Sequence, residues 1–247
     1  MKSPTEYKSG LVAILDALGA AAYGRAEIDR FMRSRDIVLG LAREKAEDTL
    51  NVDLLSIFTF NDTIVFGLQA ENNRPTIREA SAFFQLLRKF MVDSLRNGIL
   101  FRGAIAIGTF YADKDTNTVM GEAVTDAASW YTKANWIGVH ATPRTTILLN
   151  GLLEKEKKKR DYVMVNYPVP MKGRPPVQLK VVNWPKALFV RGLVPVSLRE
   201  TPRANVLSWF GRQPIPDGAE EKCFNAIAFF DKIVKTQRLT PAPDTGK

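Results

Sequence analysis

The chain has 247 residues, of which 45% are hydrophobic and 25% charged, and its formal net charge is +9. This length and composition allow a substantial core in one large domain or two small ones, and there is no apolar run of about eighteen residues that would span a membrane. One cysteine, Cys223, and one histidine, His140, exclude an intrachain disulfide and a four-ligand Cys/His zinc site. The first residues lack the apolar core of a signal peptide, so we expect a cytoplasmic protein.

The first predicted element is a buried strand that ends in an acid. Residues 10–15 form a continuous apolar run that closes at Asp16. Small residues around Gly19 and Ala20 then predict a turn, and apolar residues at helical spacing predict a helix over 28–41. Backbone amides at such a corner can hold phosphate oxygens. Asp16 could equally be the cap of the helix that follows it.

A hairpin is predicted next, with a second acid at its tip. Runs of β-branched and aromatic residues over 52–60 and 63–68 flank Asn61 and Asp62, which predicts a two-residue turn. Asn61 tolerates the positive φ that such turns require. A carboxylate presented on two apolar strands indicates a ligand or a catalyst, although Asp62 could also be an ordinary turn residue.

The remaining elements of the first half complete a recognisable order. We expect an amphipathic helix over 76–96, a strand over 99–108 that Arg102 enters, an irregular and partly extended arm over 109–120, a second amphipathic helix over 121–134 and a strand over 136–140. The order of strands and helices is βαββαβ, which predicts an α+β protein with a ferredoxin-like core, an antiparallel sheet and helices on one face.

This topology places the ends of the two acid-bearing strands side by side. Two neighbouring carboxylates repel each other unless a cation lies between them. Mg²⁺ or Mn²⁺, hard ions that prefer oxygen ligands, suit a pair such as Asp16 and Asp62.

The second half predicts additions to the same sheet. We expect a helix over 144–158, strands over 161–166 and 177–183, an exposed basic loop over 171–174 and a closing helix over 220–236. We divide the chain into an N-terminal extension (1–9), a main domain (10–185), a C-terminal helical extension packed on that domain (186–239) and a flexible tail (240–247).

Four runs, taken together with their order and spacing, resemble the class III nucleotidyl cyclase domain: residues 11–19, 58–62, 102–108 and 121–129. Within that family the chain is most similar to the bacterial pyrimidine cyclases of the Pycsar anti-phage system. That closer resemblance rests on residues 121–128, 136–139, 169–173 and 182–185, and the whole match covers about residues 10–185.

The resemblance implies a two-metal active site. Asp16 and Asp62, with the backbone carbonyl of Ala17, would hold two Mn²⁺ or Mg²⁺ ions per site, and the amides of Leu18, Gly19 and Ala20 would contact the triphosphate. The implied reaction is intramolecular: the ribose 3′-oxygen attacks the α-phosphate and pyrophosphate leaves.

The resemblance also implies partners. The family builds its active sites between two domains, so a chain with one cyclase domain implies a homodimer with two shared sites. Lys172 matches the phosphate-contacting lysine of the family and would act across the dimer. The cyclic nucleotide would activate a separate effector protein.

Departures from the family pattern bear on the base. Purine-specific members carry a lysine where this chain has Phe58 and an acid where it has Thr118. The absence of this lysine and this acid favours a pyrimidine substrate, UTP ahead of CTP, with Arg102 donating a hydrogen bond to a base carbonyl.

Two further departures concern the ribose and the transition state. Thr125 stands at the position of a ribose-positioning asparagine, and Ser129 at that of an arginine. Ser129 cannot supply positive charge, so another cation stands in or the enzyme is slow. The candidates are Arg102, Lys133, Lys172 and Arg174.

Other interpretations remain open. The chain could be a catalytically degenerate cyclase-like module that binds nucleotide, or a polymerase or nuclease whose excess charge serves nucleic acid. No third catalytic carboxylate and no basic groove support the latter, so we expect no stable nucleic-acid partner. Arg102 and Lys172 could be solvated surface residues, and Glu122 and Asp126 could simply favour a helix dipole.

Overall fold

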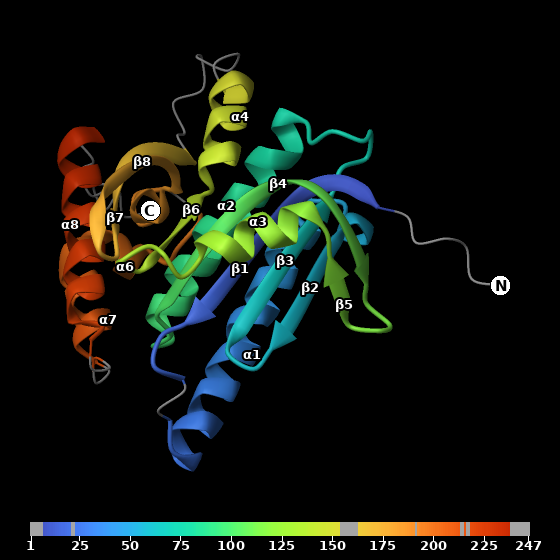
Figure 1. Ribbon diagram of the computed structural model, residues 1–247. Coiled ribbons are helices and arrows are strands. Elements are labelled where there is room, and N and C mark those ends of the chain that lie inside the picture. Colours follow the sequence, from blue (N-terminus) through green and yellow to red (C-terminus); the bar gives the residue numbers. More distant parts are fainter. Residues whose placement is uncertain are drawn as a thin grey trace.

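The computed structural model describes residues 7–20, 23–153, 163–190, 192–212, 215 and 218–237 (Figure 1). The first half of the chain forms β1 (Lys8–Ala17), α1 (Arg25–Glu47), the 3₁₀ helix η2 (Val52–Leu54), β2 (Leu55–Phe60), β3 (Thr63–Gln69), α2 (Ile77–Arg96) and β4 (Phe101–Asp113). The second half forms β5 (Thr118–Met120), α3 (Glu122–Trp130), β6 (Gly138–Ala141), α4 (Pro143–Leu153), β7 (Met164–Met171), β8 (Arg174–Val182), α5 (Trp184–Ala187), α6 (Val196–Glu200), α7 (Pro202–Gly211) and α8 (Glu220–Gln237).

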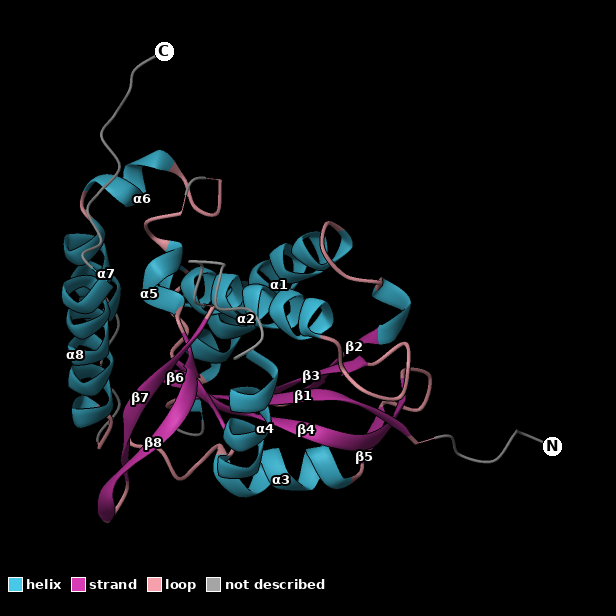
Figure 2. Cartoon of the chain, turned by 90° about the horizontal axis from the view of Figure 1, so that it is seen from above, coloured by secondary structure: helices cyan, strands magenta, loops and turns pink. Residues whose placement is uncertain are grey.

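The strands form one sheet in the order β2-β3-β1-β4-β6-β8-β7, and β5 pairs with β4. The first four positions are those of a ferredoxin-like βαββαβ unit, which confirms the predicted α+β core and its C-terminal additions. The four strands of this core are antiparallel, with α1 and α2 on one face, as expected. The expectation does not extend to the whole sheet, because β6 runs parallel to β4 and α3 lies on the face opposite α1 and α2 (Figure 2). The connection through β5 and α3 is long enough to return the chain for parallel pairing.

Alternation along β1 explains the two faces of the sheet. Leu11, Ala13 and Leu15 belong to the large hydrophobic core under α1 and α2, whereas Val12 and Ile14 belong to a smaller core that includes residues of α3. Successive side chains of a strand point to opposite faces. Asp16 therefore continues the series of Val12 and Ile14 and faces the side of the sheet on which α3 packs.

Several boundaries differ from those predicted. β4 continues to Asp113 and returns through β5, so the arm expected over 109–120 is a hairpin, with Asn117 at φ 50°. Thr109, Phe110 and Tyr111 favour a strand and simply extend it. α3 ends at Trp130 because Ala134, four residues later, pairs with Met171 of β7.

Some predictions fall partly on residues outside the described part of the chain. The helix expected to reach 158 is described to Leu153, and the strand expected from 161 is described from Met164. The predicted tail, 240–247, lies wholly outside the described residues.

The C-terminal helices share the core of the sheet. Phe229 of α8 packs against Tyr167 of β7 at a ring distance of 4.7 Å and against Trp136 at 5.2 Å, while Trp184 of α5 lies 6.3 Å away.

Among the described helices, none is both long and apolar enough to cross a membrane.

Candidate functional site

The β2–β3 turn brings Asp62 to the end of β1. Asn61 has φ 53°, as a two-residue hairpin turn requires, and Phe60 pairs directly with Thr63. Thr63 in turn pairs with Asp16, and the Ala17 amide donates to the Asp62 carbonyl at 3.1 Å. The two acids thus lie on neighbouring strand ends at one edge of the sheet (Figure 1).

On the other side of β1, Asp16 pairs with Arg102 of β4. The two residues are direct partners in the strand register, and Arg102 Nε and Nη2 both donate to Asp16 Oδ2, at 3.0 and 2.8 Å. The side chains are only 15% and 14% exposed. A Cβ on the next residue, Gly103, would lie 2.6 Å from the Ile14 carbonyl, so glycine permits this close approach of the strands.

This pairing bears on the predicted base reader. A guanidinium that gives two N–H groups to a carboxylate does not offer the same donors to a uracil or cytosine carbonyl. To contact a base, Arg102 would have to use its remaining N–H groups or leave Asp16.

In the turn after β1, one of the three backbone amides predicted to bind phosphate already forms a hydrogen bond within the protein. The Leu18 amide donates to the Leu100 carbonyl at 2.9 Å, which leaves Gly19 and Ala20 for the predicted phosphate contact. Gly19 has φ 84°, a backbone conformation that favours glycine. α1 starts only at Arg25, so these amides belong to a turn and not to a helix N-terminus.

Tyr23 lies over this turn and was not anticipated from the sequence. Its hydroxyl donates to the Leu18 carbonyl at 3.3 Å, and its ring packs on Phe31. Burial, together with the negative charges of Glu27 and Asp62, raises the pKa of Tyr23. The Tyr23 hydroxyl, whose pKa the charge of Asp62 raises, is thus a further polar group near these strand ends. No sequence motif around Tyr23 indicates this position.

The donor set suits Mg²⁺ or Mn²⁺. It consists of the Asp16 and Asp62 carboxylates and the Ala17 carbonyl, and the Arg102 guanidinium already lies on Asp16 as a cation. In the described part of the chain, no three His, Cys, Asp or Glu side chains gather as a metal cluster. Two carboxylates are sufficient for Mg²⁺, which usually keeps several waters and takes further oxygens from substrate phosphates.

Lys172 lies in the tight turn between β7 and β8. Its amide donates to the Lys133 carbonyl at 2.9 Å, which ties the turn to the segment after α3. Burial lowers the pKa of Lys172, the positive charges of Arg102 and Lys222 lower it further, and Asp16 opposes them. The charge of Asp16 therefore acts on Lys172 of the same chain, and the predicted action of Lys172 across a dimer stays a prediction.

The N-terminal part of α8 supports this turn. Asn135 donates its amide to the Pro170 carbonyl at 2.8 Å and its side chain to Glu221 at 2.6 Å, while Asn225 donates to the Asn135 carbonyl at 2.7 Å. Lys222 of the same helix is buried and donates to the Gly218 carbonyl. Sequence reasoning missed Asn135, because its contacts with Glu221 and Asn225, 86 and 90 residues away, leave no local pattern.

Two other cations gather on Trp130, at the end of α3. Lys133 Nζ lies 4.4 Å and the Arg174 guanidinium 5.0 Å from the ring centroid. Beneath them His140 is fully buried, its ring edge against Trp130 and its Nδ1 3.3 Å from the Ala141 carbonyl. Burial lowers the pKa of His140 to about 4, so it is neutral near pH 7 and holds no charge for catalysis.

The remaining predicted residues lie apart from Asp16. Phe58 is on the same sheet face, 2% exposed and stacked on Phe60 at 6.5 Å. Thr118 pairs with Asp113, eleven residues along β4 from Arg102, so it occupies the far end of that strand. Thr125 and Ser129 are exposed on α3, and the Ser129 hydroxyl donates to the Asp126 carbonyl.

The acids of α3 are committed to neighbouring elements. Asp126 accepts a hydrogen bond from the Thr142 hydroxyl at 2.7 Å, and Glu122 forms an ion pair with Arg144. These contacts connect α3 to the start of α4. The two acids therefore have specific partners in addition to any favourable interaction with the dipole of α3.

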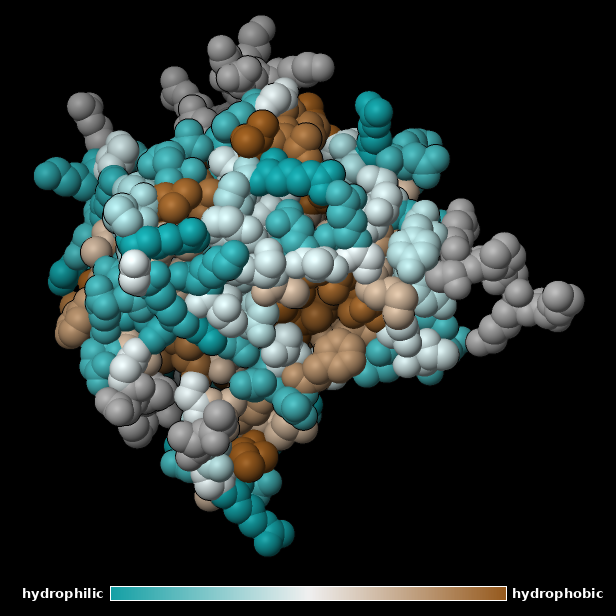
Figure 3. All heavy atoms as spheres, in the orientation of Figure 1, coloured by the Kyte–Doolittle hydropathy of each residue, from teal (hydrophilic) through white to brown (hydrophobic). Residues whose placement is uncertain are grey.

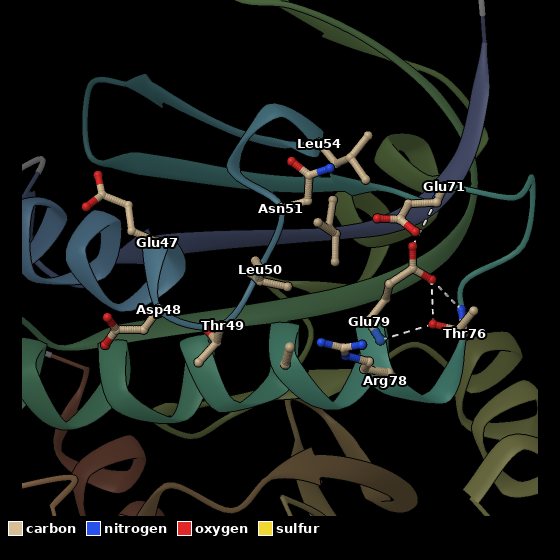
Figure 4. Close-up of a pocket in the computed structure, with 12 residues that line it drawn as sticks. Glu47, Asp48, Thr49, Leu50, Asn51, Leu54, Glu71, Thr76, Arg78 and Glu79 are labelled. Atoms are coloured by element: carbon tan, nitrogen blue, oxygen red, sulfur yellow. Dashed lines mark hydrogen bonds between the residues drawn. The ribbon is translucent and has the colours of Figure 1, made fainter.

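A cavity of about 570 Å³ opens elsewhere, between the end of α1, η2 and the start of α2 (Figure 4). It lies at the end of β3 opposite Asp62. Four carboxylates line it, those of Glu47, Asp48, Glu71 and Glu79. Glu79 accepts hydrogen bonds from the Glu71 amide at 2.9 Å and from the Thr76 amide at 2.6 Å. Burial raises the pKa of Glu79, and these hydrogen bonds lower it more, to below its usual value.

Comparisons with known proteins support the same fold. No protein-family model matches the chain, and no curated protein matches it. Among solved structures, the adenylyl cyclase CyaB from P. aeruginosa is similar, with a TM-score of 0.51 and 15% identity over 72% of this chain and 94% of that one. The catalytic core of a rhodopsin-guanylyl cyclase with converted specificity, in complex with ATPαS, has a TM-score of 0.50 and 13% identity over 73% of this chain and 98% of that one. The chain therefore has the fold of class III nucleotidyl cyclase domains.

Proposed function

We propose that this chain is a metal-dependent nucleotidyl cyclase that converts UTP, with CTP as second candidate, into the 3′,5′-cyclic mononucleotide and pyrophosphate. The observation that carries the proposal is the placement of Asp16 and Asp62 on adjoining strand ends within this fold. A chain that only binds nucleotide has no need of two acids at one strand edge.

Two divalent ions bound there would make the ribose 3′-hydroxyl easier to deprotonate and would neutralise charge on the α-phosphate. Asp16, Asp62 and the Ala17 carbonyl would hold them. Gly19 and Ala20 would present backbone amides to the triphosphate, and Lys172 would hold its negative charge in place.

The choice of a pyrimidine rests on Phe58. Its buried ring stacks on Phe60 and has no hydrogen-bonding group, so it cannot recognise the polar edge of adenine or guanine. Thr118, a short hydroxyl side chain, stands where an acid would read a purine.

A homodimer would complete the site. Within one chain, Thr118 is far from the strand end that carries Asp16, while Thr125 and Ser129 face solvent. A hydrophobic area is visible beside α3, over β2 and β3, on the face shown in Figure 3, and Phe60 is 40% exposed. We propose that a second copy covers this area and brings these residues toward its partner's acids.

We place the enzyme in the cytoplasm, where its product would be a second messenger of anti-phage defence that acts on a separate effector. Residues 10–185 would form the cyclase domain and 186–239 an extension that supports the β7–β8 turn.

The test is turnover of all four ribonucleoside triphosphates with Mn²⁺ or Mg²⁺, with products identified by mass spectrometry. Cyclic UMP or CMP with pyrophosphate is the expected result. Preference for ATP or GTP would overturn the base assignment but keep the cyclase.

The alternative is a degenerate cyclase-like module that binds nucleotide without turnover. The observation that favours this alternative is Ser129, an uncharged residue at the position of an arginine in the family. Tight nucleotide binding without any product would favour this alternative.

A further inference from the structure

The ion pair at the end of β1 is unusual in how it uses the carboxylate. Arg102 gives both of its bonding nitrogens to a single oxygen, Oδ2 of Asp16. Both side chains are mostly buried, so solvent screens their attraction less than at a surface. The pair joins directly opposed residues of β1 and β4, and its position is therefore set by the sheet and not by a flexible loop.

We propose that Arg102 is the resident counter-ion of Asp16, and that a divalent cation binds Asp16 by displacing this guanidinium toward the bound nucleotide. The inference rests on the proposed metal site and adds a role for Arg102 that the nucleotide-cyclase assignment does not contain.

The physical argument is competition for one carboxylate. A carboxylate whose oxygen already accepts two charged N–H groups is a weaker ligand for a second cation. A divalent ion at Asp16 and Asp62 would also lie within a few ångströms of the guanidinium, where like charges repel strongly in a partly buried site. Metal binding therefore favours the state in which Arg102 has left Asp16.

The direction of release follows from the surrounding charges. Arg102, Lys172 and Lys222 repel one another electrostatically, and Asp16 opposes this repulsion, so an anion beside these three cations would be favoured. A nucleoside triphosphate brings that anion. The released arginine would then supply the positive charge that Ser129 lacks.

The first experiment compares Mn²⁺ binding to the full-length wild-type chain, Arg102→Gln and Arg203→Gln, by calorimetry or by electron paramagnetic resonance of free Mn²⁺. Glutamine keeps most of the length of the side chain and removes the charge. Arg203 is the matched control, because it also gives two nitrogens to an aspartate, Asp231, but at the surface of α7 and α8.

We expect Arg102→Gln to bind Mn²⁺ about tenfold more tightly than the wild type, a difference of about 1.4 kcal/mol. Arg203→Gln should bind it as the wild type does. Unchanged or weaker binding by Arg102→Gln overturns the proposal, because Arg102 would then be a positioning residue for Asp16 and not its competitor.

A second experiment needs no variant and remains valid if Arg102→Gln does not fold. Wild-type protein is treated with phenylglyoxal, which modifies free guanidinium groups, with and without Mn²⁺, and each arginine is quantified by peptide mass spectrometry. Mn²⁺ should raise the modification rate of Arg102 several-fold and leave that of Arg203 unchanged. An unchanged or lower rate at Arg102 contradicts displacement.

These results separate the two proposals. Displacement of Arg102 by Mn²⁺ without turnover of any nucleotide keeps this inference and overturns the proposed function. Nucleotide turnover without displacement of Arg102 keeps the proposed function and overturns this inference.

Discussion

Two arginine–aspartate pairs in different elements of the molecule use the same groups in different surroundings. Arg203 of α7 gives Nε to one oxygen and Nη2 to the other oxygen of Asp231 on α8, and these side chains are 60% and 42% exposed. Arg102 of β4 gives both nitrogens to one oxygen of Asp16, and these side chains are 15% and 14% exposed.

The difference shows which carboxylate is available for chemistry. The Arg203 fork matches the two oxygens of Asp231 and fastens two helices at the surface, where such pairs contribute little to stability. The second carboxylate oxygen of Asp16 takes no part in the two hydrogen bonds from Arg102. Asp16 also lies beside Asp62 and is mostly shielded from water. Burial and neighbourhood, more than the residue types, distinguish a candidate active-site pair from a structural one.

The largest expected effect is on activity. Asp62→Ala should lower nucleotide turnover by at least about a hundredfold, because loss of a metal ligand removes several kcal/mol of charge stabilisation. The dimer should still form, as measured by light scattering. Asp231→Ala is the matched control and should keep its turnover. Retained activity in Asp62→Ala would mean that the metal assignment is wrong.

The next effect is on stability. Asp16→Asn leaves the Arg102 charge buried without its partner and should lower the free energy of unfolding by about 2 kcal/mol. Asp231→Asn should lower it by less than about 1 kcal/mol, because water solvates the arginine that remains. Urea denaturation at neutral pH measures both variants, and equal losses would remove the distinction between the pairs.

Burial at this end of the sheet also predicts a pH dependence. The pKa of His140 is lowered by burial from its ordinary 6.5 to about 4. Between these two pH values the imidazole is protonated in the unfolded chain and neutral in the folded chain. Its contribution to stability is complete above pH 6.5 and is lost as the pH falls toward 4. Between pH 6.5 and 5 the loss should reach about 2 kcal/mol.

His140→Gln isolates this contribution. Urea denaturation of the variant and the wild type at pH 7, 6 and 5 should show a smaller acid-induced loss in the variant, whatever its stability at pH 7. Parallel curves would show that another group is responsible.

The smallest effect concerns the surface pair. Arg203→Gln should change the free energy of unfolding only slightly, and the difference from the wild type should shrink as salt is raised, because ions screen exposed charges. Thermal unfolding at low and high ionic strength measures it. A loss as large as that of Asp16→Asn would show that exposure does not separate the two pairs.

Much of the fold could be predicted from local patterns. Alternating and continuous apolar runs predicted β1 to β4 and their order, because a strand or a helix must bury one face. The turn at Asn61 and Asp62 was predicted from residue types that accept its dihedral angles, and the structure has it at that position. The β4–β5 hairpin and the parallel pairing of β6 with β4 were missed, since neither the length of a strand nor its pairing partner is encoded within a short window.

The sequence by itself determined where the two acids stand, because each lies at the end of an apolar run or in a turn that its neighbours dictate. Only the tertiary structure decided what surrounds them. It joined Asp16 to Arg102 across 86 residues and placed Lys172 where the charges of Asp16, Arg102 and Lys222 act on it. Such contacts depend on how strands pair and on which face each side chain takes, and these are settled by the packing of the whole sheet.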